Sequence, residues 1–359
     1  MRYKKLGRTG LLVSELCFGT MTFGGGSRGG IWANMGALEQ KAANDLMKGS
    51  FDAGVNFFDT ANVYASGESE TIVGQAIRDL GLPRDEIVIA TKAFGRFQFW
   101  PGASEADAKR RATARNISGL SRKHLMDAID ASLLRLGLDH VDLYQIHGSD
   151  PLTPLEETLD ALDVIVRAGK VRYIGFCNLA AWQAAKVNGI AERKNLARFE
   201  SAQVYYSIGG RDIEREIVPL ALEENMAILP WSPLAGGFFS GKFARQGGGP
   251  NDARRAAFDF PPVNRERGFD IIDVIRAIAD EKGVSVATIA LAWMLHKPGV
   301  TSIIIGAKTV EQLKQNIAST EVRLSAQEMA KLDEVSALPV EYPGWMLDRQ
   351  GGDRRSQVN

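Results

Sequence analysis

The sequence predicts an α/β protein of the (β/α)8 TIM barrel type, with a β-hairpin in front of the barrel and loop insertions at its active-site end. Three observations predict this fold. Eight apolar runs of strand length alternate with eight segments whose apolar residues recur at helical spacing. The runs are continuously apolar, as expected for parallel strands buried on both faces. A chain of 359 residues and 39.1 kDa has the length for one large barrel.

Both ends of the chain are expected to lie outside the ring of strands. Residues 3–6 and 11–13 read as two short strands, and the turn between them has glycine at each end, so they predict a hairpin. We assign residues 1–338 to a single barrel domain and residues 339–359 to a C-terminal tail. The last residues of the tail, 351–359, are expected to fray.

The barrel elements follow in a regular order. The strands are expected at residues 16–20, 55–58, 87–91, 141–146, 171–176, 201–205, 227–231 and 301–305. The helices are expected at residues 39–53, 68–80, 122–136, 155–168, 181–192, 213–224 and 269–282, and from Thr309 onwards. Pro219 should open a new first turn, where a helix tolerates proline. A doubly wound sheet has the same alternation, so the count alone leaves both topologies open.

A glycine-rich stretch after the first strand, Gly24 to Gly29, matches the G-x-G-x-x-G pattern of dinucleotide-binding folds. That fingerprint opens directly into a helix whose N-terminus holds a pyrophosphate, whereas here further glycine, tryptophan and asparagine residues prolong a loop. We therefore expect residues 24–38 to form a loop near the pocket. Residues 95–119 and 246–264 also read as loops, and insertions of this kind are common on the active-site side of barrels.

Composition and charge argue against several classes of partner. Lys plus Arg (43) balance Asp plus Glu (43), so no overall field attracts nucleic acid or an anionic membrane. The N-terminus lacks the pattern of a signal peptide, and no apolar run is long enough to span a bilayer. Cys17 and Cys177 are too few for a disulfide framework and lack CxxC spacing. We therefore expect a cytoplasmic protein with free thiols.

Polar residues stand at or just after the C-terminal ends of successive strands. They are Asp59, Tyr64, Lys92, His147, Asn178, Gln203, Trp231 and Ser232. In a closed barrel these ends share one rim, where such folds carry out their chemistry. Taken singly, each residue type has a structural explanation, because aspartate favours turns, a lysine is usually solvated and a histidine is often a satisfied core residue. Their convergence favours a catalytic site.

The motifs in this series resemble those of the aldo-keto reductase superfamily, in the same order. The matching segments are Asp59-Thr60-Ala61-Asn62-Val63-Tyr64, Thr91-Lys92, Tyr144-Gln145-Ile146-His147, Asn178, Gln203 and Trp231-Ser232-Pro233-Leu234. The likeness extends from the N-terminal hairpin to about Leu338. Within the superfamily, the sequence is similar to the bacterial aldehyde and ketone reductases, which are related to the aryl-alcohol dehydrogenases and to the potassium-channel β subunits. It implies a barrel closed at the bottom by the hairpin, and reversible hydride transfer from NADPH to an aldehyde or ketone without a metal.

The resemblance implies four catalytic residues, and each role has a physical reason. Tyr64 is the general acid that protonates the alkoxide formed from the carbonyl. Lys92 adjusts the pKa of Tyr64, because a nearby ammonium favours the phenolate and typically lowers the pKa of a phenol by about 1 to 3. Asp59 keeps Lys92 charged, since a buried, unpaired lysine tends to lose its proton. His147 orients the carbonyl oxygen as charge develops there.

The resemblance also implies where the cofactor binds. Asn178 and Gln203 would contact the nicotinamide carboxamide, and Trp231 would stack on the ring, with core packing as the alternative. Cys177 stands where the family commonly has serine, which weakens one hydrogen bond. The other cofactor-binding residues are Asp59 at its strand end, Gly19, Thr20 and Met21 at the ribose, Ser232, Leu234, Gly236, Ser240 and Lys242 at the pyrophosphate, and Gly306, Lys308, Gln312 and Asn316 at the adenosine end.

Lys308 favours NADPH over NADH. A cation beside a helix N-terminus suits the 2′-phosphate, and no acidic residue is placed to hold a bare ribose diol. Thr309 and Gln312 also have the spacing of a capping box, which alone gives them a structural role.

The sequence indicates least about the residues that form the substrate pocket. Trp32 and Trp100 lie on predicted loops above the mouth and favour a bulky or aromatic carbonyl compound, although they are equally suited to packing the loops down. Two other functions stay open. One is an NADPH-binding sensor or regulatory subunit with slow turnover, and the other is a Schiff-base aldolase with Lys92 as the nucleophile. The sequence gives no oligomeric state.

Overall fold

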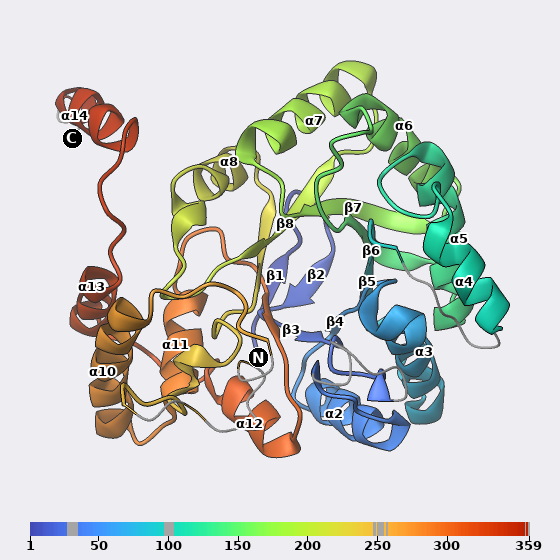
Figure 1. The fold of residues 1–359 in the computed structure, drawn as a ribbon. Helices are drawn as coiled ribbons and strands as arrows, with labels where there is room; N and C mark the ends of the chain where they lie inside the picture. The colour runs from blue at the N-terminus through green and yellow to red at the C-terminus, as the bar shows by residue number, and fades with distance from the viewer. Residues whose placement is uncertain are drawn as a thin grey trace.

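A barrel of parallel strands forms the centre of the molecule, and helices surround it (Figure 1). The computed structural model describes residues 1–26, 35–96, 104–246, 249, 255, 258–355 and 357. The barrel strands are β3 (Leu16–Gly19), β4 (Phe57–Asp59), β5 (Val88–Ala93), β6 (Val141–Ile146), β7 (Val171–Cys177), β8 (Phe199–Tyr205), β9 (Ala227–Trp231) and β10 (Ile303–Ile305). The hairpin consists of β1 (Tyr3–Lys5) and β2 (Leu12–Ser14), which pair antiparallel.

The strand order decides between the two topologies that the sequence leaves open. Strands β3 to β9 lie side by side in chain order, and β10 returns to pair with β3, so that every pair of neighbours is parallel. Across the remaining seam, Ile228 on β9 forms a parallel bridge with Val300, just before β10. The predicted (β/α)8 barrel is confirmed, and the doubly wound sheet is excluded.

Helices follow the strands and, except for α14, surround the barrel (Figure 1). They are α2 (Gln40–Asp52), α3 (Glu68–Leu80), α4 (Glu105–Thr113), α5 (Arg122–Leu136), α6 (Leu155–Arg167), α7 (Ala181–Lys194), α8 (Ile217–Glu223), α10 (Arg265–Lys282), α11 (Val286–Leu295), α12 (Val310–Ala318), α13 (Ala326–Val335) and α14 (Gly344–Arg355). Short 3-10 helices occur at η2 (Tyr64–Gly67), η3 (Asp212–Glu214) and η4 (Phe238–Ser240). None of the helices in the described part of the chain combines the length and apolar character needed to cross a membrane.

Most boundaries lie within a few residues of their predicted positions, and Pro219 falls in the first turn of α8, as predicted. Four helices, however, are missing from the prediction: α4, α11, α13 and α14. Every residue of α11 is buried, so this helix has no polar face and none of the 3.6-residue alternation that identifies a helix in a sequence. Helix α4 lies in a stretch predicted as a loop, although Ser104 and Asp107 form a capping box at its start.

The C-terminal segment leaves the barrel after α13. Helix α14 stands apart from the ring of helices at the end of an extended stretch (Figure 1). Val340 and Tyr342 in this stretch are largely exposed. The prediction that residues 351–359 fray is wrong for residues 351–355, which belong to α14. The division of the chain after residue 338 stays a prediction.

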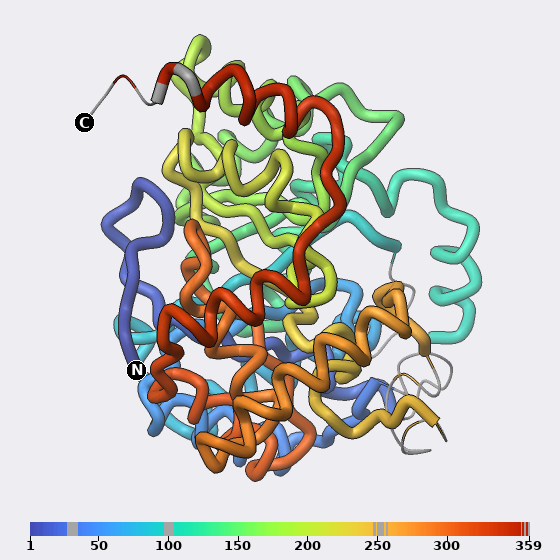
Figure 2. The backbone as a smooth tube through the Cα atoms, turned by 90° about the vertical axis from the view of Figure 1, so that its left-hand side faces the viewer, coloured from blue at the N-terminus to red at the C-terminus, as the bar shows by residue number. Residues whose placement is uncertain are grey.

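Side chains on the two faces of the strands pack into two separate apolar clusters. The larger lies between the strands and the helices and includes Phe58. The smaller lies inside the barrel, where Phe57 packs with Leu6 and Val13 from the hairpin. The hairpin and α4 lie at opposite ends of the barrel (Figure 2). The hairpin thus contributes apolar side chains at the bottom of the barrel. The C-terminal ends of the strands, at the opposite end, are left open for a functional site.

Candidate active site

The alternation of side chains along the strands directs the polar residues into the barrel. Phe57 packs inside the barrel and Phe58 outside it, so Asp59, two residues after Phe57, points inward again. On β5, Val88 and Ala90 pack inside, and the same period carries Lys92 inward. These side chains therefore meet at the C-terminal end of the barrel.

Lys92 is fully buried, and its ammonium is surrounded by oxygen atoms. It forms a salt bridge with Asp59, donates a hydrogen bond to the carbonyl oxygen of Thr60 at 2.8 Å, and lies 3.3 Å from the hydroxyl oxygen of Tyr64. Burial is the largest single influence on the pKa of Lys92 and acts to lower it, but the carboxylate of Asp59, together with Tyr64 and Cys177, more than offsets burial and holds that pKa well above its usual value. Lys92 is therefore a fixed positive charge behind the hydroxyl of Tyr64.

The carboxylate of Asp59 is held by two amides as well as by Lys92. Gln203 on β8 donates to its Oδ2 atom at 2.9 Å, and Gln145 on β6 donates to the same atom at 3.3 Å. Four strands thus fix the acid and amine pair. Gln145 lies within one of the motifs quoted above, but sequence reasoning gives it no role. Its position two residues after the inward-facing Leu143 is the signal that could have found it.

Tyr64 is carried by a turn with an unusual backbone. Ala65, Ser66 and Gly67 follow it with φ values of 47°, 58° and 96°. A left-handed conformation costs about 1–2 kcal/mol for a residue with a side chain. Such strain persists only where the surrounding structure over-determines it. The position of Tyr64 is therefore imposed by its neighbours.

His147 follows β6 and faces Tyr64. Its backbone N–H donates to the carbonyl oxygen of Ala93 at 3.0 Å, and its ring meets the ring of Tyr64 edge-on, with centroids 5.8 Å apart. Burial, together with the charge of Lys92, lowers the pKa of His147 to about 3. The imidazole is therefore neutral at physiological pH and can offer an N–H to an oxygen atom.

The protonation behaviour of Tyr64 differs from the sequence prediction. Burial raises the pKa of Tyr64, and the charge of Lys92 reverses only part of that increase. The net direction is upward, so the predicted lowering is wrong. The sequence shows which charge lies near the phenol, but it does not show how much water the fold removes from it.

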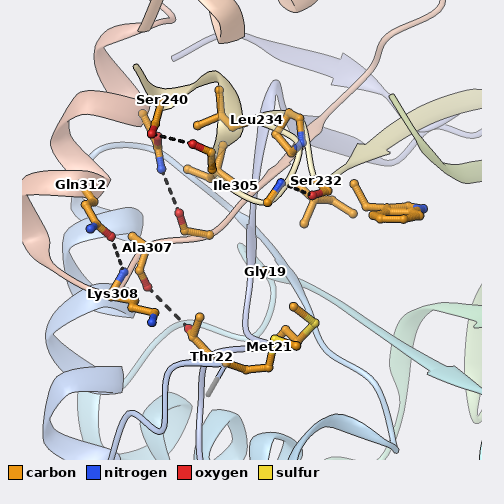
Figure 3. Close-up of a pocket in the computed structure, with 18 of the residues that line it drawn as sticks. Gly19, Met21, Thr22, Ser232, Leu234, Ser240, Ile305, Ala307, Lys308 and Gln312 are labelled. Carbon is orange, nitrogen blue, oxygen red and sulfur yellow. Dashed lines mark hydrogen bonds between the residues drawn. The ribbon is translucent and has the colours of Figure 1, made fainter. Parts of the chain in front are cut away.

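A cavity of about 810 Å³ opens above these residues (Figure 3). The predicted site residues that line it are Gly19, Met21, Asp59, Tyr64, His147, Asn178, Gln203, Trp231, Ser232, Leu234, Gly236, Ser240, Lys242, Gly306, Lys308, Gln312 and Asn316. One cavity thus joins the strand ends of β3, β4 and β6 to β10 with the start of α12. A site of this size and form suits an extended organic ligand.

Three predicted residues do not line this cavity. Lys92 reaches its neighbours from below, Cys177 is buried, and the hydroxyl of Thr20 is bonded to the carbonyl oxygen of Asp59 at 3.1 Å. Thr20 therefore offers no hydroxyl to a ribose. The two predicted substrate residues, Trp32 and Trp100, lie outside the described residues.

Aromatic residues that the sequence reading does not assign line the same cavity: Phe243, Phe258 and Phe260. Phe260 stacks on Trp231, with ring centroids 5.8 Å apart and an angle of 14° between the planes. Trp231 also donates its indole N–H to the side-chain oxygen of Asn178 at 3.0 Å. Phe258 and Phe260 come from residues 246–264, which are predicted only as a loop, and no pattern in the sequence shows that these rings turn towards the cavity.

The loop after β9 and the start of α12 form the far wall of the cavity. Ser232 accepts a hydrogen bond from the backbone of Gly236 at 2.9 Å. Thr309 caps α12, but the side chain of Gln312 accepts from the backbone N–H of Lys308 at 2.8 Å and not from that of Thr309 (Figure 3). The predicted capping box is therefore shifted by one residue, and Gln312 fixes the backbone of Lys308.

No group of three or more histidine, cysteine, aspartate and glutamate side chains suited to a metal ion occurs among the described residues. The chemistry that the arrangement itself supports is proton transfer. A phenol and an imidazole face one space, and a paired ammonium lies behind the phenol, so an oxygen atom in this space that gains negative charge would find donors.

Comparison with known proteins identifies a family whose sequences match this chain. Residues 15–337 match the model of the Aldo/keto reductase family. The chain is 34% identical over 352 residues to versiconal hemiacetal acetate reductase of Aspergillus parasiticus, covering 96% of this chain and 99% of that one. It is 35% identical to the uncharacterized oxidoreductase YrpG of Bacillus subtilis, covering 93% and 96%. It is 37% identical to a probable voltage-gated potassium channel subunit β of Arabidopsis thaliana, covering 90% and 92%.

Proposed function

The chain belongs to the aldo/keto reductase family, and we propose that it reduces an aldehyde or ketone to the alcohol, reversibly, with NADPH as the reductant. The family supports an oxidoreductase that acts on carbonyl groups. The observation that carries the specific proposal is the hydroxyl of Tyr64, 3.3 Å from the ammonium of Lys92, at the edge of the large cavity. This pair supplies a proton donor and a charge that stabilises the donor after it has lost its proton.

The residues present fit a nicotinamide dinucleotide. Lys242 and Lys308 line the cavity, and the only carboxylate among its described lining residues is Asp59, which is already paired with Lys92. A polyanionic cofactor would therefore meet two cations and no free carboxylate. Lys308, at the start of α12, is placed to hold a 2′-phosphate, which favours NADPH over NADH. Asn178 and Gln203 would hold the carboxamide beside Trp231.

When bound, the reduced cofactor supplies a hydride. The carbonyl oxygen of the substrate lies between Tyr64 and His147, which both border the cavity. The neutral imidazole of His147 donates a hydrogen bond that orients this oxygen. Tyr64 donates its proton to the oxygen as negative charge develops there, and Lys92 stabilises the resulting phenolate. Asp59 keeps Lys92 protonated throughout.

The wall of the cavity supports a bulky or aromatic substrate. Phe258, Phe260 and Trp231 provide flat apolar surface beside the reacting groups. Aromatic rings prefer to pack with other rings in offset or edge-on contacts. An aryl aldehyde would fit this lining better than a small polar carbonyl compound. We place the protein in the cytoplasm, in keeping with its two free, buried cysteines.

The direct test is oxidation of NADPH in the presence of 4-nitrobenzaldehyde, followed by the loss of absorbance at saturating substrate. Replacement of Tyr64 by phenylalanine should lower kcat by a factor of about 10² to 10⁴, the usual contribution of general acid catalysis. The Kd for NADPH, measured by fluorescence titration, should stay within about twofold of wild type. A Tyr64→Phe variant that keeps most of its turnover would show that another group donates the proton.

A second candidate is a regulatory subunit that binds NADPH and turns over slowly, supported by the 37% identity to the potassium channel subunit. Tight retention of NADPH together with slow single-turnover oxidation would favour it. The Schiff-base aldolase has little support, because the salt bridge with Asp59 keeps Lys92 protonated, whereas a nucleophilic lysine needs a free amine.

A further inference from the structure

A buried ion pair lies outside the cavity, on the outer face of the barrel. Arg135 on α5 donates from its Nε atom to the Oε2 atom of Glu70 on α3, at 2.7 Å. The side chain of Glu70 is fully buried, and that of Arg135 is 6% exposed. Burying charges is costly unless every one of them is paired and hydrogen-bonded. Neither residue lines the cavity, so ligand binding does not explain the pair.

Glu70 also holds the strand that carries Lys92. Its second oxygen, Oε1, accepts a hydrogen bond from the hydroxyl of Thr91 at 2.6 Å. Thr91 directly precedes Lys92 on β5, so the two side chains point to opposite faces of the strand. One carboxylate thus connects α5 through Arg135 with β5 through Thr91.

The same group supports the strained turn that carries Tyr64. Gly67 ends this turn with a φ of 96°, and a Cβ atom there would lie 2.8 Å from the Cδ atom of Arg135. Arg135 therefore packs directly against the backbone of the turn. On the other side of Tyr64, the backbone N–H of Asn62 donates to the carbonyl oxygen of Lys92 at 3.1 Å. The turn is thus tied to β5 both before and after Tyr64.

We propose that Arg135, Glu70 and Thr91 form a clamp of positioning residues that sets the distance between the hydroxyl of Tyr64 and the ammonium of Lys92. The inference rests on the proposed function of those two residues and extends it to the outer face of the barrel. The hydrogen bond from Thr91 to Glu70 links the part of the turn after Tyr64 to the strand. Without it, the strain in residues 65–67 can relax by moving Tyr64 away from Lys92.

The test compares Thr91→Val, which removes the hydroxyl at nearly the same volume, with Thr91→Ser, which keeps it. A displacement of about 1 Å can cost up to roughly 10²-fold in rate. We expect Thr91→Val to lower kcat with 4-nitrobenzaldehyde by about 10-fold, with the Kd for NADPH within about twofold of wild type. Thr91→Ser should restore most of the rate. Thr91→Ala provides a second hydroxyl-free variant if the valine variant does not fold.

The pH profile separates positioning from loss of stability. The reduction needs Tyr64 protonated, so its rate falls as the pH rises through the pKa of Tyr64. The charged or titratable groups near this phenol are Lys92, Asp59, Cys177 and His147. Of these, Lys92 is the cation that offsets part of the rise in the pKa of Tyr64 that burial causes. When Lys92 is farther away, the fall in rate should move to higher pH in Thr91→Val and return towards wild type in Thr91→Ser.

Asp142→Asn is the matched control. Asp142 pairs with Arg84 at 2.7 Å and accepts from the backbone N–H of Ile89 at 2.8 Å, near the opposite end of the barrel. This variant should lose thermal stability and keep the wild-type kcat and pH profile. A Thr91→Val variant with wild-type kcat and profile, or an Asp142→Asn variant with the same changes as Thr91→Val, would overturn the proposal.

Crystal structures of wild type and Thr91→Val provide a readout that does not depend on turnover. The distance between the Tyr64 hydroxyl and the Lys92 ammonium should be longer in the variant, and an unchanged distance refutes the clamp. An inactive wild-type protein in which the distance does respond to Thr91→Val would instead refute the proposed function alone.

Discussion

Replacing Asp59 with asparagine tests the charge arrangement behind Tyr64. Lys92 would keep the carbonyl of Thr60 and the hydroxyl of Tyr64 as partners, but it would lose its only salt bridge among the described residues. Burial without a partner carboxylate should then lower the pKa of Lys92 far below its usual value, as in other fully buried lysines. At pH 8 the amine of Lys92 should therefore be mostly neutral in Asp59→Asn.

The lost charge sets the size of the effect on turnover. At 3.3 Å and an effective dielectric constant of about 20, an ammonium attracts a full phenolate by about 5 kcal/mol. If half of the phenolate charge has developed in the transition state, the loss is about 2.5 kcal/mol, or roughly 70-fold in kcat. We expect a loss of this order at pH 8, measured as the oxidation of NADPH with 4-nitrobenzaldehyde.

The pH dependence of the variant gives the sharper result. As the pH falls, the lysine of Asp59→Asn should regain its proton, so the variant should recover part of its rate between pH 8 and pH 5.5. The wild-type rate should change little over this range, because Asp59 keeps Lys92 charged throughout. Asp142→Asn, the same substitution in a second ion-paired aspartate, serves as the control. A variant that keeps more than half of the wild-type kcat at pH 8, or whose reduced rate does not depend on pH, would refute the reasoning.

Two further predictions concern the cofactor and the imidazole. Lys308→Ala should raise the KM for NADPH by about 10-fold or more, since hydrogen bonds to charged groups contribute roughly 1.5–3 kcal/mol. The KM for NADH should stay nearly constant, and Lys314→Ala, an exposed lysine on the same helix, should change neither constant. Equal changes for both cofactors would contradict the assignment of the 2′-phosphate. Because the pKa of His147 is about 3, kcat/KM for the aldehyde should show no inflection from this residue between pH 5 and 8. A fall near pH 6.5 that His147→Gln removes would show that the imidazolium acts as an acid.

Much of the fold could be predicted because it depends on local patterns. Continuous apolar runs identify parallel strands, and the alternation along each strand already implies that Asp59 and Lys92 share the interior. Helix α11 could not be predicted in this way, because a helix buried on all sides lacks an amphipathic period. Within the site, the direction of the pKa of Tyr64 depends on burial, which is a property of the closed barrel. The approach of Phe260 to Trp231 likewise depends on how a long loop folds back.

One physical cause explains the opposite shifts of the two neutral donors. Burial disfavours whichever form of a group carries charge, so it raises the pKa of Tyr64 and lowers that of His147. Both residues are therefore neutral hydrogen-bond donors at the same pH. Lys92 is the exception because its salt bridge with Asp59 stabilises the charged form of the amine. Gln203 and Gln145 in turn hold the carboxylate of Asp59 in place. A substrate oxygen bound between them, as we propose, would meet two neutral donors backed by one fixed cation, an arrangement whose attraction grows as the oxygen gains negative charge. It follows that removing Gln145, which does not line the cavity, should act through the ionisation of Lys92 and not through direct contact with the cofactor or the substrate.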